Sequence, residues 1–121
     1  MFNIELQKSA DILIRDIFDV KKGESVVITA DTRSCMEVAE VIAASAYAAG
    51  GIPMVCIMPT QEGFGQEADG ELPVDALSGA LLGADVWIEI NYRGLLYSTP
   101  FGQSFWISSF NLLMRPPQFP R

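Results

Sequence analysis

The chain has 121 residues, enough for one domain that buries about two-thirds of the surface of its unfolded form. Half of the residues are hydrophobic and 19% are charged, which is typical of a globular protein. The formal net charge of −7 argues against nucleic-acid binding, because a phosphate-binding surface needs clustered Lys and Arg. No apolar run reaches the roughly 18 residues that span a bilayer, and no signal peptide opens the chain, so we expect a cytoplasmic protein without a transmembrane segment.

The chain contains no histidine, which removes the commonest general base and the commonest ligand for zinc, copper or iron. Its two cysteines, Cys35 and Cys56, are expected to be free thiols. Without a histidine as its base, a catalytic thiolate at Cys35 is not expected. The sequence therefore predicts no catalytic residue, no metal ligand and no cofactor in this chain.

An amphipathic helix is predicted over residues 4–18, with Asn3 as its N-cap. The apolar residues of this segment recur three and four positions apart and so share one face: Leu6, Ala10, Leu13, Ile14, Ile17 and Phe18. The turn at 21–24 separates it from the next element.

A β-branched run predicts the first strand over residues 25–30. Ser34 and Glu37 then have the spacing of a capping box, in which each side chain accepts a hydrogen bond from a backbone N–H at the start of a helix. This helix is expected to run to Ala49 and to end at Gly50, which supplies a left-handed residue.

Two further strands are predicted, over residues 54–58 and 85–90, on either side of a polar loop (60–72) and a short helix (74–82). The resulting α-β-α-β-α-β order predicts an α/β fold with a Rossmann-like, three-stranded parallel half-sheet in which the first strand is central. Three strands are few for an open sheet, so either the tail adds to it or the sheet is left unfinished.

The last third of the sequence differs from the rest, because residues 90–121 contain no acidic residue. We expect a Rossmann-like domain over residues 1–100 and an atypical hydrophobic tail, rich in aromatic residues and proline, over 101–121. The apolar residues of the tail suit either a membrane or partner surface or the capping of the unfinished sheet. Self-association through this tail or through the unfinished sheet is therefore predicted.

In open parallel sheets, ligands bind beyond the carboxyl ends of the strands, where the strand order reverses. The candidate ligand-binding residues at this place are Asp31, Thr32, Arg33, Ser34, Asn91 and Tyr92. Arg33, beside a helix N-terminus, suits a carboxylate or a phosphate. In the plainer interpretation Asp31 and Ser34 only cap the helix and Arg33 is a solvated turn residue.

Two motifs in the loop at 60–72 are judged coincidental. Residues 63–68 match the dinucleotide-binding pattern G-x-G-x-x-A by letter, but they do not follow a strand directly or open a helix. The acidic residues of this loop do not have the spacing of a helix-loop-helix calcium site. A solvated polar loop is the simpler interpretation.

Several stretches together resemble the N-terminal domain of the thermophilic metalloprotease family, the aminopeptidase T-like leucyl aminopeptidases. They are Val20-Lys21-Lys22-Gly23-Glu24-Ser25-Val26-Val27-Ile28, Ala49-Gly50-Gly51-Ile52-Pro53, Leu72-Pro73, Ala84-Asp85-Val86-Trp87-Ile88-Glu89 and Leu95-Leu96-Tyr97-Ser98-Thr99-Pro100. Related members include a dihydroxypyridine ring-opening dioxygenase on the same scaffold. The resemblance implies two-domain enzymes whose metal ligands lie in a C-terminal domain, so a divalent metal is expected only in a full-length relative.

Three functions are compatible with these observations. The first is an N-terminal domain, or a truncated or frame-shifted form, of a metal-dependent leucyl aminopeptidase-like hydrolase without catalysis of its own, with a dioxygenase-family fragment as a variant of this hypothesis. The second is a non-catalytic module for small-ligand binding or assembly. The third is a small enzyme that uses the carboxylates of Asp31 and Glu89.

Overall fold

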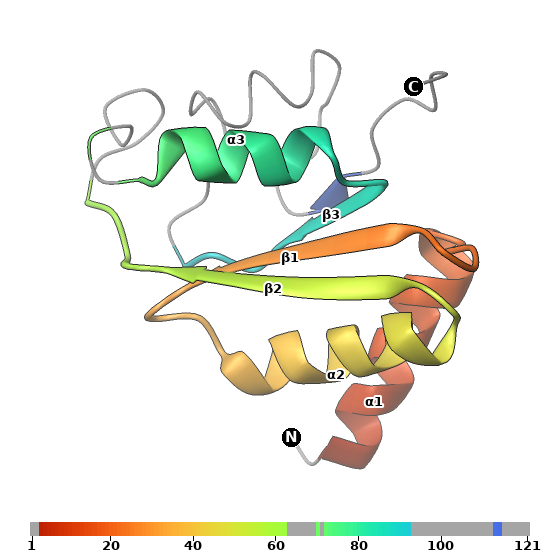
Figure 1. Ribbon diagram of the computed structural model, residues 1–121. Helices are drawn as coiled ribbons and strands as arrows, with labels where there is room; N and C mark the ends of the chain where they lie inside the picture. The colour runs from red at the N-terminus through yellow and green to blue at the C-terminus, as the bar shows by residue number, and fades with distance from the viewer. Residues whose placement is uncertain (1–2, 63–69, 71, 93–112, 115–121) are drawn as a thin grey trace.

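The predicted alternation of helices and strands is confirmed by the computed structural model, which describes residues 3–62, 70, 72–92 and 113–114. In this part of the chain the elements are α1 (Asn3–Asp11), η1 (Ile12–Ile17), β1 (Ser25–Asp31), α2 (Met36–Ala48), β2 (Ile52–Met58), α3 (Val74–Leu82), β3 (Val86–Glu89) and β4 (Leu113–Met114). The fold is α/β and Rossmann-like, with α1 and α2 on one face of an open sheet and α3 on the other (Figure 1).

The strand order is β2-β1-β3-β4, so β1 is central, as predicted. β1 is parallel to both neighbours: Ser25 aligns with Ile52 of β2, and Thr29 aligns with Glu89 of β3. The two-residue β4 runs antiparallel to β3. The sheet therefore gains one short strand from the tail. The other tail residues, and most of the loop at 60–72, lie outside the described residues, so the domain boundary at residue 100 stays a prediction.

The two faces of the sheet carry different side chains. Residues with even numbers in β1 and β3, such as Ile28 and Ile88, pack with α1 and α2 in one core cluster. Residues with odd numbers, such as Val27 and Trp87, pack against α3 in a second cluster. Toward the carboxyl ends of the strands the odd positions become polar, and these buried polar residues are Thr29, Asp31 and Glu89. The apolar core on the α3 side thus gives way to a buried polar row.

The first predicted helix is α-helical only as far as Asp11, and η1 continues it as a π-helix. The wider spacing is seen where the N–H of Phe18 bonds to the C=O of Leu13, five residues earlier, at 3.0 Å. Ile14 is fully buried and Phe18 is 6% exposed, so both side chains still reach the core. Asn3 lies within the helix, and its prediction as N-cap was wrong.

The predicted capping box at Ser34 was also wrong. α2 begins at Met36, its N-cap is Cys35, and no side chain forms a capping hydrogen bond there. The hydroxyl of Ser34 is used elsewhere, in a bond to the C=O of Ile90. The end of α2 is as predicted, because Gly50 has a φ of +94°. β2 begins at Ile52, two residues earlier than expected, and Pro53 is its second residue.

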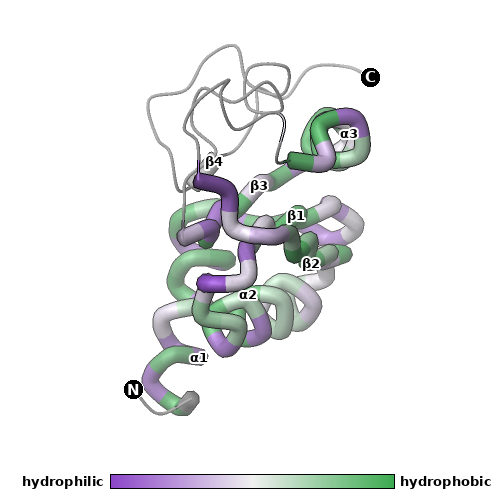
Figure 2. Tube along the Cα trace, turned by 90° about the vertical axis from the view of Figure 1, so that its left-hand side faces the viewer, coloured by the Kyte–Doolittle hydropathy of each residue, from purple (hydrophilic) through white to green (hydrophobic). Residues whose placement is uncertain are grey.

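Hydrophobic and hydrophilic residues both occur along α1 and α2, and the buried hydrophobic side chains of these helices pack against the sheet (Figure 2). The described part of the chain contains no helix long and apolar enough to cross a membrane.

Candidate ligand-binding site at the strand ends

The turn after β1 is held by its own side chains. The buried carboxylate of Asp31 accepts the N–H of Arg33 at 2.9 Å, and the N–H of Asp31 donates to Ser34 Oγ at 2.9 Å. The Ser34 hydroxyl donates in turn to the C=O of Ile90 at 2.7 Å, which ties the turn to the segment after β3. Asp31 and Ser34 thus have a structural role in fixing the backbone from which Arg33 projects.

The guanidinium of Arg33 lies over the ring of Tyr92, with 5.4 Å between its central carbon and the ring centroid. This is a cation–π contact between two exposed side chains. Among the described residues, the one ion pair within 4.0 Å joins Lys21 to Asp19, so no carboxylate of that part neutralises Arg33. The charge of Arg33 is therefore available to an anion.

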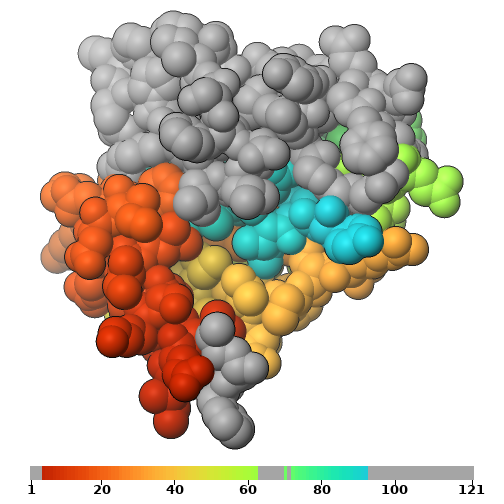
Figure 3. All heavy atoms as spheres, turned by 180° about the vertical axis from the view of Figure 1, so that it is seen from behind, coloured from red at the N-terminus to blue at the C-terminus, as the bar shows by residue number. Residues whose placement is uncertain are grey.

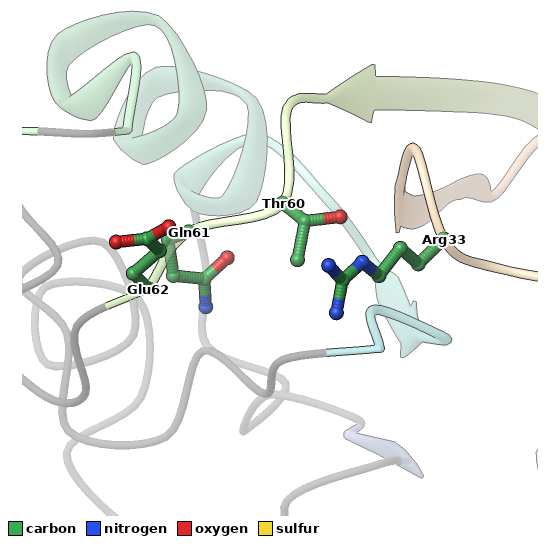
Figure 4. Close-up of a pocket in the computed structure, with 4 residues that line it drawn as sticks. All are labelled: Arg33, Thr60, Gln61 and Glu62. Atoms are coloured by element: carbon green, nitrogen blue, oxygen red, sulfur yellow. The ribbon is translucent and has the colours of Figure 1, made fainter.

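A hollow of about 220 Å³ opens beside this arginine, lined by Arg33, Thr60, Gln61 and Glu62. The guanidinium and the amide of Gln61 extend into the same space, whereas the carboxylate of Glu62 is turned away from the arginine (Figure 4). The two sides of the hollow are joined at Thr32, whose hydroxyl lies 3.1 Å from that of Thr60 and accepts the N–H of Thr60 at 3.3 Å. The hollow thus offers one cation and several neutral polar groups, with the carboxylate of Glu62 on the side away from the arginine.

Asn91 lies between the two residues that contact the turn, Ile90 and Tyr92. Its side chain is 94% buried, since only 6% of its surface is exposed. Neither its amide nitrogen nor its amide oxygen has a hydrogen-bond partner among the residues that the structure describes. Buried amides are normally paired with protein groups or ordered water, so this donor and acceptor at a strand end could accept a water molecule or a ligand group.

The segments that follow β1, β2 and β3 gather at one edge of the sheet. Because β1 is the central strand, the turn after it lies between the segment after β2 and the segment after β3, and the three regions (orange, green and cyan) are neighbours on the face seen from behind (Figure 3). All six predicted residues belong to this edge: Asp31, Thr32, Arg33, Ser34, Asn91 and Tyr92. Their proximity is a finding, whereas their binding of a ligand stays a prediction.

Thr60 and Gln61 were not predicted as site residues from the sequence, and Glu62 was considered only among the acidic residues of a calcium site. These residues follow β2, so the same rule about strand ends that selected the turn after β1 would have found them. The hollow lies between the turn after β1 and the segment after β2.

The buried acids do not make a metal site in the described residues. Asp31 is fully buried and Glu89 is 2% exposed. No group of three or more His, Cys, Asp or Glu side chains that could hold a metal ion occurs in the described part of the chain. The described residues therefore do not form a site for a divalent metal.

Comparison with known proteins gives a structural likeness alone. No family profile matches the sequence, and no curated protein matches it. The structure is similar to that of 2,5-dihydroxypyridine dioxygenase from Pseudomonas putida KT2440, with a TM-score of 0.67 and 17% identity over 86% of this chain. The matched region covers 32% of the dioxygenase, so this chain spans about a third of its length.

These comparisons overturn the resemblance to aminopeptidase T-like leucyl aminopeptidases. A solved structure that matches is a dioxygenase, which the sequence suggested only as a minor variant, and nothing found supports an aminopeptidase-like hydrolase. The motifs that suggested it were a glycine turn, short strands and an alanine-rich helix. Such motifs report the Rossmann-like scaffold, which hosts many unrelated activities.

Proposed function

We propose that this chain binds a small anionic molecule at the carboxyl ends of its strands and does not convert it. The proposal is supported by two features of this sheet edge. Arg33 has no described carboxylate within 4.0 Å, and the buried amide of Asn91 has no hydrogen-bond partner among the described residues. A carboxylate or phosphate suits Arg33, because guanidinium groups bind both through paired hydrogen bonds. The aromatic ring of Tyr92 and the hydroxyls of Thr32 and Thr60 add neutral contacts around the charge.

The ligand is expected to be small, because the hollow is small. A volume of about 220 Å³ lies below the roughly 300–1,000 Å³ of drug-sized ligand pockets. Benzoate and inorganic phosphate are suitable probes, since each offers an anionic group and only benzoate has a flat apolar body for the ring of Tyr92. Acetate separates the contribution of the carboxylate from that of the aromatic body.

The test follows ligand binding by two-dimensional NMR, with attention to the side-chain amide of Asn91. A saturable shift of this amide with one of the three anions is expected, and Arg33→Gln should weaken the binding at least about tenfold, which is about 1.4 kcal/mol. Arg15→Gln is the matched control, because Arg15 is an exposed arginine of η1. Equal effects of the two substitutions, or shifts that never saturate, would contradict the proposal.

The structural neighbour favours a second candidate, a contribution to dioxygenase chemistry on a dihydroxypyridine ring. It is supported by the likeness of fold alone. The test is to add 2,5-dihydroxypyridine to the protein, with and without divalent metal ions, and to follow dioxygen uptake together with the amide of Asn91. Uptake that depends on Arg33 would favour this candidate over simple binding, and no uptake with a shifted Asn91 amide would favour binding alone.

A further inference from the structure

The outer edge of β2 is open in the described structure. β2 is the terminal strand of the sheet, and no described element lies beyond it (Figures 1 and 2). Three of its apolar side chains are largely exposed: Ile52 by 60%, Met54 by 47% and Ile57 by 57%. Natural edge strands are usually protected by charged side chains, bulges or proline, and Pro53 is the one such feature among the seven residues of β2.

The backbone groups on this edge can be assigned from one hydrogen bond. The N–H of Ile52 donates to the C=O of Glu24 at 2.8 Å, so the backbone groups of Ile52 face β1. Because these groups alternate along a strand, those of Pro53, Val55 and Ile57 face outward. Pro53, which has no N–H, therefore occupies a position where no donor to β1 is needed. Val55 and Ile57 present donors and acceptors to whatever approaches the edge.

We propose that β2 pairs with β2 of a second copy of this chain, antiparallel and about a two-fold axis at Val55. In this register Val55 exchanges both backbone hydrogen bonds with Val55 of the second copy. Ile57 lies opposite Pro53 of the second copy and donates its N–H to the C=O of that proline. Pro53 has no N–H, so the second hydrogen bond of this residue pair does not form. The register therefore pairs the outward N–H groups of both Val55 and Ile57.

The same register covers the exposed side chains. Met54 lies opposite Cys56 of the second copy on the α3 side of the sheet, and Ile52 lies opposite Met58. Ile57 lies beside Pro53 on the α2 side. The contact is isologous, because both copies contribute the same surface. It also joins the two sheets into one, which resolves the small number of strands noted from the sequence.

A second copy can approach this chain closely only at an uncharged surface, and the edge of β2 is such a surface. Two copies that each carry a net charge of −7 repel one another over most approaches. The segment Ile52–Met58 contains no acidic or basic residue, so the copies can meet there without opposing charges. A contact limited to one strand is at the small end of stable interfaces, and we therefore expect a reversible dimer.

The experiment combines sedimentation velocity over a series of concentrations with amide hydrogen exchange. The native chain should shift from monomer toward dimer as concentration rises, with slower exchange of the Val55 and Ile57 amides. Ile57→Pro removes one outward donor and leaves the bonds to β1 intact, so it should abolish or strongly weaken the dimer while the monomer stays folded by circular dichroism. Ile57→Ala is the matched control, because it removes the side chain and keeps the N–H.

The outcomes separate the possible occupants of the edge. A monomer at every concentration would overturn the proposal, as would a dimer that Ile57→Pro leaves unchanged, which would place the contact elsewhere on the chain. A complex whose mass is not a multiple of 13.2 kDa would show that a different molecule occupies the edge. None of these results depends on anion binding at Arg33, so the two proposals fail independently.

Discussion

Ser34 Oγ donates a hydrogen bond to the backbone C=O of Ile90 at 2.7 Å, across 56 positions of sequence. The same hydroxyl accepts the N–H of Asp31 at 2.9 Å. One small side chain thus joins the end of β1 to the segment after β3. The candidate site depends on this bond, because Arg33 projects from one of the joined segments and Tyr92 from the other.

Ser34→Ala is therefore expected to destabilise the protein more than an ordinary hydroxyl deletion. It leaves the N–H of Asp31 and the C=O of Ile90 without this partner, which should lower the free energy of unfolding by about 1–3 kcal/mol. Urea denaturation measures the change. Ser9→Ala is the control, since the Ser9 hydroxyl makes only a 3.4 Å bond on an exposed helix face, and a change within about 0.5 kcal/mol is expected there. Equal effects would show that Ser34 does not hold the strand ends together.

Two glycines should respond to alanine with opposite signs. A Cβ on Gly51 would lie 2.9 Å from Cγ1 of Val20 and 3.2 Å from the C=O of Ala46, so Gly51→Ala must displace backbone or core. A Cβ on Gly79, within α3, meets nothing within 4 Å. We expect Gly51→Ala to destabilise by about 1–3 kcal/mol through overpacking, and Gly79→Ala to stabilise by about 0.5–1 kcal/mol through helix propensity. Thermal unfolding of both variants tests this, and a common sign would contradict the packing around Gly51.

The order of elements could be predicted from the sequence because local pattern and burial agree along most of the chain. The β-branched run of β1 and the left-handed residue at Gly50 are local signals with one structural meaning. The π-helix η1 could not be foreseen, because Ile14 and Phe18 fit the apolar face of an α-helix equally well. The capping pattern at Ser34 failed because the C=O of Ile90, remote in sequence, binds its hydroxyl.

Part of the candidate site could likewise be predicted from the sequence, and part could not. The rule about strand ends predicted Arg33 and Tyr92 together, and their contact at 5.4 Å is a finding of the structure. The hollow beside Thr60 was missed, since its polar surroundings in sequence indicated a solvated loop. The bond between the hydroxyls of Thr32 and Thr60 is a tertiary contact that no local pattern encodes.

A half-buried polar cluster joins α1 to α2 and gives a third prediction. Ser45 Oγ accepts Gln7 Nε2 at 2.6 Å and donates to Asp11 Oδ1 at 2.6 Å, and Ser45 is fully buried. Ser45→Ala should lower the free energy of unfolding by about 1–3 kcal/mol, because it leaves polar atoms of Gln7 and Asp11 without this partner. Urea denaturation measures the loss.

The control for this cluster is the pair of substitutions Gln7→Leu and Ser45→Ala combined. Removing both polar partners of one bond should cost less than the sum of the two single changes, since fewer groups remain unsatisfied. Additive losses would show that Gln7 and Ser45 stabilise the helices separately.

The two cysteines should differ in reactivity. Cys35 is exposed, whereas Cys56 is half-buried on the α3 side of β2, and burial raises the pKa of the Cys56 thiol above its ordinary value of 9.0. The thiolate is the reactive form, so a thiol reagent should label Cys35 first and Cys56 more slowly at neutral pH. Labelling of Cys35→Ser and Cys56→Ser, followed by mass spectrometry at low protein concentration, separates the two rates. Faster labelling of Cys56 would contradict its burial.

The same pKa shift predicts how stability depends on pH. A thiol whose pKa is higher in the folded chain than in the unfolded chain stays protonated in the fold while the unfolded form loses its proton. The contribution of Cys56 to stability is therefore fully present below about pH 9 and is lost as pH rises through the folded pKa. The urea midpoint of the native chain should fall across this range more steeply than that of Cys56→Ala, which has no thiol at this position. Parallel curves would show that burial of Cys56 does not penalise its thiolate.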